Sequence, residues 1–121
     1  MIFADFRNNV PHLLRTTDLL LLPSTSEGLP LTILEAQASR AVVLAAPTAG
    51  IPEVVEHGRT GYLIAAHDAA GYAAQIAELL RRPEFMREIA EAAHRHVCDH
   101  HDLRSYGDRV LGEYARLAPA T

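Results

Sequence analysis

The chain is poor in several features that would assign it to a special class of protein. It has one cysteine, Cys98, so it cannot form an internal disulfide, and it fits a reducing compartment. No apolar stretch approaches the roughly 20 residues that a membrane-spanning helix needs. The first residues, MIFADFR, lack the basic start and the long apolar run of a secretory signal peptide. We therefore expect a cytoplasmic location, with a peripheral place at a membrane surface as the alternative.

An excess of basic residues is also missing. The 121 residues include 11 Lys and Arg against 15 Asp and Glu, which gives a formal net charge of -4. Proteins that bind duplex nucleic acid usually present a basic face, so we expect no nucleic-acid partner. Hydrophobic residues make up 49% of the chain, which is enough for one core in one small domain.

Short apolar runs separated by turns predict alternating strands and helices up to about residue 65. The run Leu19 to Leu22 is too short for a helix, and its lack of alternation is typical of a parallel strand that is buried on both faces. A first helix is expected after Asn9, which has the character of an N-cap. The order of elements predicts an α/β fold with a partial Rossmann-like parallel sheet. The other predicted strands cover residues 1–6, 41–45 and 62–64, and the other predicted helices cover 31–39 and 51–56.

The remainder of the chain is predicted to be helical. Asp68 caps one helix, Pro83 ends it and begins the next, and Asp102 caps a third. We expect one domain over residues 1–121, with an α/β part at 1–65 and a helical part at 68–117. The residues expected to face inward are Tyr72, Ala73, Ile76, Leu79 and Leu80 on the first helix and Met86, Ile89, Ala90, Ala93 and Val97 on the second.

The segment from Ser24 to Glu35 is the one that indicates chemistry. It joins the end of a strand to the start of a helix through a loop that contains Gly28 and Pro30. At the carboxyl end of a parallel strand, such a loop faces the crevice where α/β proteins bind ligands. The free N–H groups near Leu31 and Thr32, together with the helix dipole, favour an anion such as a diphosphate. Gly28 lets the backbone approach that ligand closely.

Two carboxylates, Glu27 and Glu35, flank this anion site eight positions apart. A carboxylate repels a phosphate, so each is better suited to accept hydrogen bonds from the hydroxyl groups of a ribose or a sugar. Spacing alone leaves a plainer interpretation open, in which one is a loop charge and the other a solvated charge on the helix.

The residues around these carboxylates resemble a known family. The segment PSTSEGLPLTILEA, residues 23–36, resembles the E-x7-E donor loop of family 4 glycosyltransferases. GIPEVV at 50–55 resembles the family's GIPE turn, and GRTGYL at 58–63 resembles its G-x-T-G-x-L turn. Residues 2–19 and 68–80 resemble the elements before and after these motifs. The resemblance therefore covers nearly the whole chain.

The resemblance implies the GT-B fold, of which this chain would form part of the C-terminal, nucleotide-sugar-binding domain. It also implies transfer of a sugar from a nucleotide-diphosphate donor to an acceptor, with retention of anomeric configuration and with neither a cofactor nor a metal. By the same resemblance, Glu27 would contact the donor sugar as the catalytic candidate, and Glu35 would hold the ribose hydroxyls. The donor-binding residues that it implies are Gly28, Leu29, Pro30, Leu31, Thr32 and Glu35.

The chain departs from the family at three points. Arg40 follows the predicted helix where the family usually has glycine, and it would cost about 1 kcal/mol if that position is left-handed. Val42 replaces a proline at the entry to the next strand. The basic clamp for the diphosphate and the acceptor domain are absent from these 121 residues. We therefore expect a chain that is marginally stable, that self-associates, or that pairs with a partner supplying the missing half.

Two alternatives to an enzyme that transfers sugar stay open. One is a non-catalytic nucleotide-sugar-binding module, and the other is a truncated remnant without activity. The intact loop at 24–35 favours the enzyme and the binding module over the remnant. The sequence leaves the donor base and sugar open, and the acceptor could be a sugar, a lipid or a small molecule.

The histidine-rich segment 94–102 invites a metal-site interpretation. His94 and Cys98 are four residues apart, as are His96 and His100, so each pair could share one face of a helix. A polar helix end, where the dipole favours histidine, is the plainer interpretation, and we expect no metal site. No arrangement of residues indicates a nucleophilic role for Cys98. Three further histidines show no pattern of partners: His12, His57 and His67.

Overall fold

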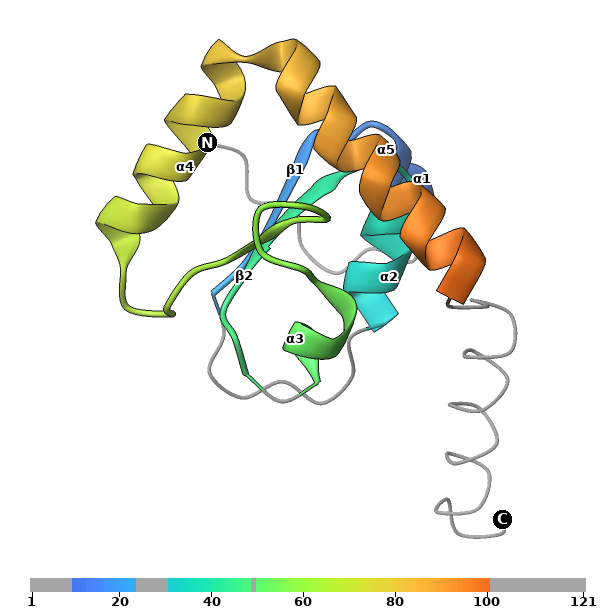
Figure 1. The fold of residues 1–121 in the computed structure, drawn as a ribbon, viewed down its shortest axis with the longest axis horizontal. Helices are drawn as coiled ribbons and strands as arrows, with labels where there is room; N and C mark the ends of the chain where they lie inside the picture. Colours follow the sequence, from blue (N-terminus) through green and yellow to red (C-terminus); the bar gives the residue numbers. More distant parts are fainter. Residues whose placement is uncertain (1–9, 24–30, 49, 101–121) are drawn as a thin grey trace, which may run out of the picture.

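The computed structural model describes residues 10–23, 31–48 and 50–100. Within these ranges a parallel three-stranded sheet is flanked by helices (Figure 1), which confirms the predicted Rossmann-like α/β fold. The strand predicted at 1–6, the cap at Asn9 and the helix after Asp102 lie outside the described residues. The proposed division into parts at 1–65 and 68–117 stays a prediction. The elements are α1 (Val10–Arg15), β1 (Leu19–Leu22), α2 (Leu31–Ala38), β2 (Val42–Ala45), α3 (Ile51–Val54), β3 (Tyr62–Leu63), α4 (Ala69–Arg81) and α5 (Pro83–His100).

The sheet has the strand order β1-β2-β3, and both pairings are parallel. Every residue of the central strand β2 is buried, as its unbroken apolar sequence predicts. The prediction of burial on both faces is wrong for β1, because the side chain of Leu21 is 44% exposed. Among the described strands, β1 lies at the edge of the sheet and pairs with β2 alone. An apolar run therefore identified the strand, but it did not indicate its place in the sheet.

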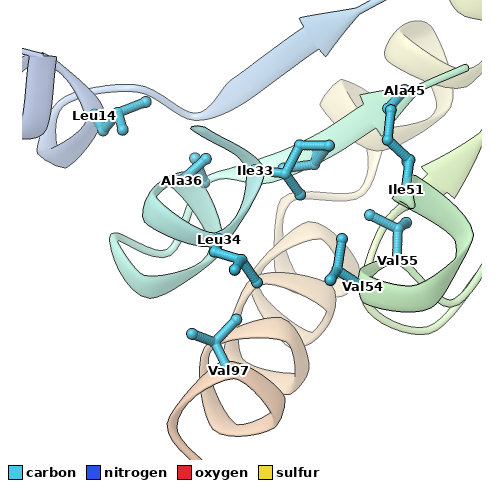
Figure 2. Packing of buried hydrophobic residues seen from close by; sticks show 11 residues of the cluster. Leu14, Ile33, Leu34, Ala36, Ala45, Ile51, Val54, Val55 and Val97 are labelled. Carbon is cyan, nitrogen blue, oxygen red and sulfur yellow. The ribbon is translucent and has the colours of Figure 1, made fainter. Parts of the chain in front are cut away.

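The core consists of two clusters on opposite faces of the sheet. Alternate residues of a strand point to opposite faces, so Val43 and Ala45 join one cluster while Val42 and Leu44 join the other. The first cluster contains side chains from α1, α2, α3 and the end of α5 (Figure 2). The second contains Tyr62 of β3 together with residues of α4 and the first half of α5. Helix α5 therefore packs against both layers.

The helices of the second half agree with their predicted caps. The Asp68 side chain accepts a hydrogen bond from the Gly71 N–H at 2.8 Å, which confirms Asp68 as the N-cap of α4. The inward face predicted for α4 is too wide, since Ala73 is exposed and Leu80 is 61% exposed. Both lie roughly a quarter turn from the buried Tyr72, at 100° per residue. On α5 the predicted inward face is confirmed. Met86 is half-buried, and the other four predicted residues are buried: Ile89, Ala90, Ala93 and Val97.

Helix α2 ends in a tight hydrogen-bonded turn in which Arg40 adopts φ 65°, so the left-handed position considered from the sequence is present. The Ala41 N–H donates to the Ala36 carbonyl at 2.9 Å, and the Arg40 N–H donates to the Gln37 carbonyl at 3.1 Å. This is the Schellman arrangement, which usually has glycine at the left-handed residue. None of the helices within the described ranges combines the length and the apolar composition that a membrane span requires.

Candidate functional site

The three parallel strands end together at one edge of the sheet. The register places Leu22 beside Ala45, and Ala45 beside Leu63. Two hydrogen bonds continue just past the strand ends: the Ala46 N–H donates to the Leu22 carbonyl at 3.1 Å, and the Ile64 N–H donates to the Ala45 carbonyl at 2.9 Å. This is the carboxyl edge of the sheet, where α/β proteins bind ligands. Figure 1 shows α3 near this edge and α5 crossing the opposite end of the sheet.

Helix α2 begins at the carboxyl edge and runs back toward the amino ends of the strands. Three predicted site residues lie on it: Leu31 and Glu35 are half-buried, and Thr32 is exposed. Residues three and four positions apart share a helix face, so Glu35 lies one turn beyond Leu31 and Thr32 on the side that solvent can reach. The opposite side of α2 is buried through Ile33, Leu34, Ala36 and Gln37.

The other predicted site residues lie outside the part of the chain that the structure describes. They are Glu27, Gly28, Leu29 and Pro30. The E-x7-E pairing of Glu27 with Glu35 therefore stays a prediction, as do the roles assigned to these residues.

The start of α4 is attached to the carboxyl edge through Tyr72. Its hydroxyl donates a hydrogen bond to the Ile64 carbonyl at 2.9 Å, just after β3. Burial raises the pKa of the Tyr72 hydroxyl above its ordinary 10.0, and the negative charge of Asp68 acts in the same direction. The raised pKa favours the protonated form of the hydroxyl, which is the form that donates this hydrogen bond.

The turn that precedes β3 is fixed by hydrogen bonds and by a ring contact. The Leu63 N–H donates to Nδ1 of His57 at 3.0 Å, and the His57 and Tyr62 rings meet edge to face at 5.6 Å between centroids. The buried Thr60 hydroxyl accepts a hydrogen bond from the Glu56 N–H at 2.8 Å. The interpretation of His57 as a histidine without partners is therefore wrong. An N–H can only donate, so Nδ1 of His57 carries no proton in this arrangement.

Gln37 is a further residue that the sequence interpretation did not single out. Its side chain is fully buried, and its Nε2 donates to the Val54 carbonyl at 3.3 Å and to the Thr60 carbonyl at 3.2 Å. The signal in the sequence is a lone amide on the apolar face of LTILEAQA, four residues after Ile33. At such a position a polar side chain is expected to bond to buried backbone groups.

The histidine-rich end of α5 packs against the end of α2. Nδ1 of His94 lies 2.9 Å from the Ala38 carbonyl, and since a carbonyl only accepts, Nδ1 carries the proton. Nε2 of His94 then lies 3.7 Å from Sγ of Cys98, while the His96 and His100 rings stack at 4.6 Å. Across residues 10–23, 31–48 and 50–100, no three His, Cys, Asp or Glu side chains come together as potential metal ligands.

The fold and the position of the site define a Rossmann-like α/β domain with its candidate binding edge at the carboxyl ends of the strands. Residues 1–96 match the protein family described as Glycosyl transferases group 1. This match covers more than half of the 121 residues, and the chain belongs to that family. Its fold is that of a GT-B C-terminal domain, as the structural neighbours show.

Three similar proteins illustrate the match. The N-acetyl-alpha-D-glucosaminyl L-malate synthase of Bacillus anthracis is 36% identical over 117 residues, which are 97% of this chain and 30% of that protein. The C-terminal domain of the glycosyl transferase group 1 family protein LpcC from Francisella tularensis has a TM-score of 0.75 at 25% identity, covering 84% of this chain and 52% of that one. HepE from Anabaena, in complex with UDP and glucose, has a TM-score of 0.78 at 26% identity, covering 93% of this chain and 31% of that one.

This chain thus spans less than a third of the length of its Bacillus anthracis relative.

Proposed function

We propose that this chain forms part of the donor site of a retaining glycosyltransferase of the family 4 type. The whole protein would move a sugar from a nucleotide-diphosphate donor to an acceptor. The observation that carries the proposal is the position of α2. This helix begins at the carboxyl edge of a parallel sheet, within the segment 23–36 that resembles the E-x7-E loop, and its accessible side presents Thr32 and Glu35. HepE, a neighbour with the same fold, has been solved with UDP and glucose.

The residues of the first two turns of α2 have distinct roles in this proposal. The N–H groups of a first helical turn have no acceptor within the helix, so those of Leu31 and Thr32 would bind the diphosphate. Glu35 begins the next turn, where its carboxylate would accept hydrogen bonds from the two ribose hydroxyls. Stabilising the departing diphosphate is where such a site gains rate, because negative charge builds there as the bond to the sugar breaks.

The remaining parts of the proposal rest on the resemblance. Glu27 would contact the donor sugar, with Gly28, Leu29 and Pro30 forming the wall of the loop. We propose that no cofactor or metal is needed, so that a chelator would leave donor binding unchanged.

The acceptor, which could be a sugar, a lipid or a small molecule, would bind to polypeptide other than these 121 residues. The polypeptide that binds the acceptor would belong either to a partner chain or to a further part of the same protein. Cytoplasmic or membrane-peripheral location stays a prediction.

Ligand-observed NMR of the chain with UDP, GDP and ADP tests the proposal. We predict saturation transfer from the protein to one of these nucleotides. We further predict that Glu35→Ala weakens its binding at least about tenfold, because two charge-assisted hydrogen bonds are lost. The matched control is Glu88→Ala, which removes the same charge from an exposed position on α5.

The outcomes separate the three candidate functions. Binding that Glu35→Ala weakens and Glu88→Ala does not would support the donor site. Such binding without any sugar transfer, even in the presence of the acceptor-binding polypeptide, would identify a non-catalytic binding module. A folded chain that binds none of the nucleotides would contradict the proposal and favour a remnant without a ligand.

A further inference from the structure

Gln37 links three segments of the chain through one buried side chain. It lies on α2, and its Nε2 group donates to the carbonyl of Val54, the last residue of α3, and to the carbonyl of Thr60 in the turn before β3. The residue is 0% exposed. Val54 and Thr60 are buried as well, and the Gln37 amide supplies a hydrogen-bond donor to the carbonyl of each.

The orientation of the amide follows from these acceptors. If the amide were rotated by half a turn, Oε1 would face two carbonyl oxygens, and three acceptors would lie together without a donor. With Nε2 facing the carbonyls, Oε1 is buried and has no hydrogen-bond partner among the described residues. A buried acceptor without a partner is unfavourable, so stability of the core alone gives a poor reason for glutamine at this position.

Two of the three linked segments border the candidate site, and the third is the turn that enters β3 from its amino end. Helix α2 carries Leu31, Thr32 and Glu35, while α3 follows the carboxyl end of β2 and the turn at 56–61 leads into β3. The turn itself is seated tightly, because a Cβ on Gly61 would lie 2.7 Å from the Val43 carbonyl oxygen of the central strand. Figure 2 shows Ile33 and Leu34 of α2 in the same aliphatic cluster as Ile51 and Val54 of α3, and aliphatic contacts have no preferred direction.

We propose that Gln37 is a positioning residue for the donor site. Aliphatic contacts between α2 and α3 allow small shifts along the helix axis, whereas two hydrogen bonds to fixed carbonyls select one position. Glu35 is two residues away on the accessible side of the same helix, so any shift of α2 moves its carboxylate by a similar amount. This inference rests on the function proposed for Leu31, Thr32 and Glu35, and Gln37 itself would not touch the ligand.

The first test compares Gln37→Met with wild type. Methionine keeps a long side chain of similar volume and removes both donors. The matched control is Leu79→Ala, which opens the core in the second cluster without touching α2. Two readouts are measured for each variant: hydrogen exchange of the backbone amides in α2 and α4, and affinity for the nucleotide among UDP, GDP and ADP that the wild-type chain binds best.

We expect the two variants to differ in both readouts. In Gln37→Met, exchange should accelerate roughly tenfold more in α2 than in α4, and nucleotide affinity should fall roughly tenfold. In Leu79→Ala, exchange should accelerate more in α4, and nucleotide affinity of the folded protein should be unchanged. If Gln37 had a merely structural role, Gln37→Met would lower stability but leave nucleotide affinity unchanged, as Leu79→Ala does.

Gln37→Glu provides a second variant in case Gln37→Met does not fold. At pH 8 the introduced carboxylate would face the two carbonyls without a proton, while at pH 5 its buried, protonated form could donate to one of them. We expect affinity relative to wild type at the same pH to be low at pH 8 and largely restored at pH 5. Affinity equal to that of wild type at both values of pH would overturn the proposal, because neither protonation state of Glu restores both hydrogen bonds of Gln37.

The failure of this inference can be told apart from the failure of the proposed function. If the wild-type chain binds a nucleotide and Gln37→Met binds it as tightly, the donor site stands and the positioning role is overturned. If the wild-type chain binds none, the proposed function has failed and the positioning role fails with it, whatever the exchange rates show.

Discussion

Arg40 combines an unfavourable backbone conformation with a favourable side-chain contact. Its φ of 65° costs a residue with a Cβ about 1–2 kcal/mol relative to glycine. Its Nε donates to Oε1 of Glu91 on α5 at 2.5 Å, and this hydrogen bond from Arg40 lowers the pKa of the Glu91 carboxyl below its ordinary 4.5. Both partners are substantially exposed, so this ion pair is a weak compensation for the strain.

Removing the ion pair first should reveal the strain at Arg40. We predict that Arg40→Gly, made in a Glu91→Ala background, raises the free energy of unfolding by about 0.5–1 kcal/mol over Glu91→Ala alone. The gain is smaller than the full strain because glycine also has more freedom in the unfolded chain. Urea denaturation of the two variants measures the difference. A double variant less stable than Glu91→Ala would show that the left-handed backbone carries no strain here.

The left-handed position of Arg40 was considered from the sequence because the family that the chain resembles usually has glycine there. Hydrogen-bond partners of buried or turn side chains were not predictable in the same way. Gln37 and His57 bond to carbonyls and amides that are 17, 23 and 6 residues away, and no local pattern specifies those partners. Such residues become visible only once the elements are placed in space.

The turn between α3 and β3 contains two glycines, Gly58 and Gly61, which are required for different reasons. Gly58 has φ +82°, and no atom lies within 4 Å of the position that its Cβ would take. At Gly61 the same test places the Cβ 2.7 Å from the Val43 carbonyl oxygen and 3.0 Å from Cγ1 of Val55. The first glycine is therefore required by backbone conformation and the second by close approach to the central strand.

Alanine substitutions should separate these two requirements. We predict that Gly61→Ala lowers the free energy of unfolding by about 2–3 kcal/mol, because backbone atoms of β2 cannot move aside as a flexible side chain would. Gly58→Ala is the matched control and should cost only about 1 kcal/mol, the price of a left-handed residue with a Cβ. Thermal and urea unfolding of both variants provide the comparison. Equal losses would mean that the turn is not seated on β2 as described.

The strands and helices were predicted well as elements, but the burial of their side chains was predicted less well. The apolar run at β1 and the wide apolar face of α4 both suggested more burial than Leu21 and Leu80 have. Hydrophobic residues are not confined to the interior, since a folded surface always includes apolar atoms. Caps gave firmer predictions, because the Asp68 side chain acts on a backbone N–H only three residues away.

At the scale of the whole molecule, α5 connects the two layers of the core. Ile89 and Ala90 belong to the cluster beneath α4, while Val97 belongs to the cluster around α2. His94 adds a polar contact to the end of α2. Helix α5 crosses the amino end of the sheet (Figure 1), and the proposed ligand would bind at the opposite, carboxyl edge. Marginal stability, self-association and pairing with a second chain stay predictions.

The central claim is that the ligand binds at the start of α2, and mapping of amide chemical shifts during a nucleotide titration tests it most directly. The account predicts that the largest changes fall on Leu31 to Leu34 and on the strand ends at Ala46 and Ile64. Changes concentrated on α4 and α5, with the first turn of α2 unaffected, would contradict it.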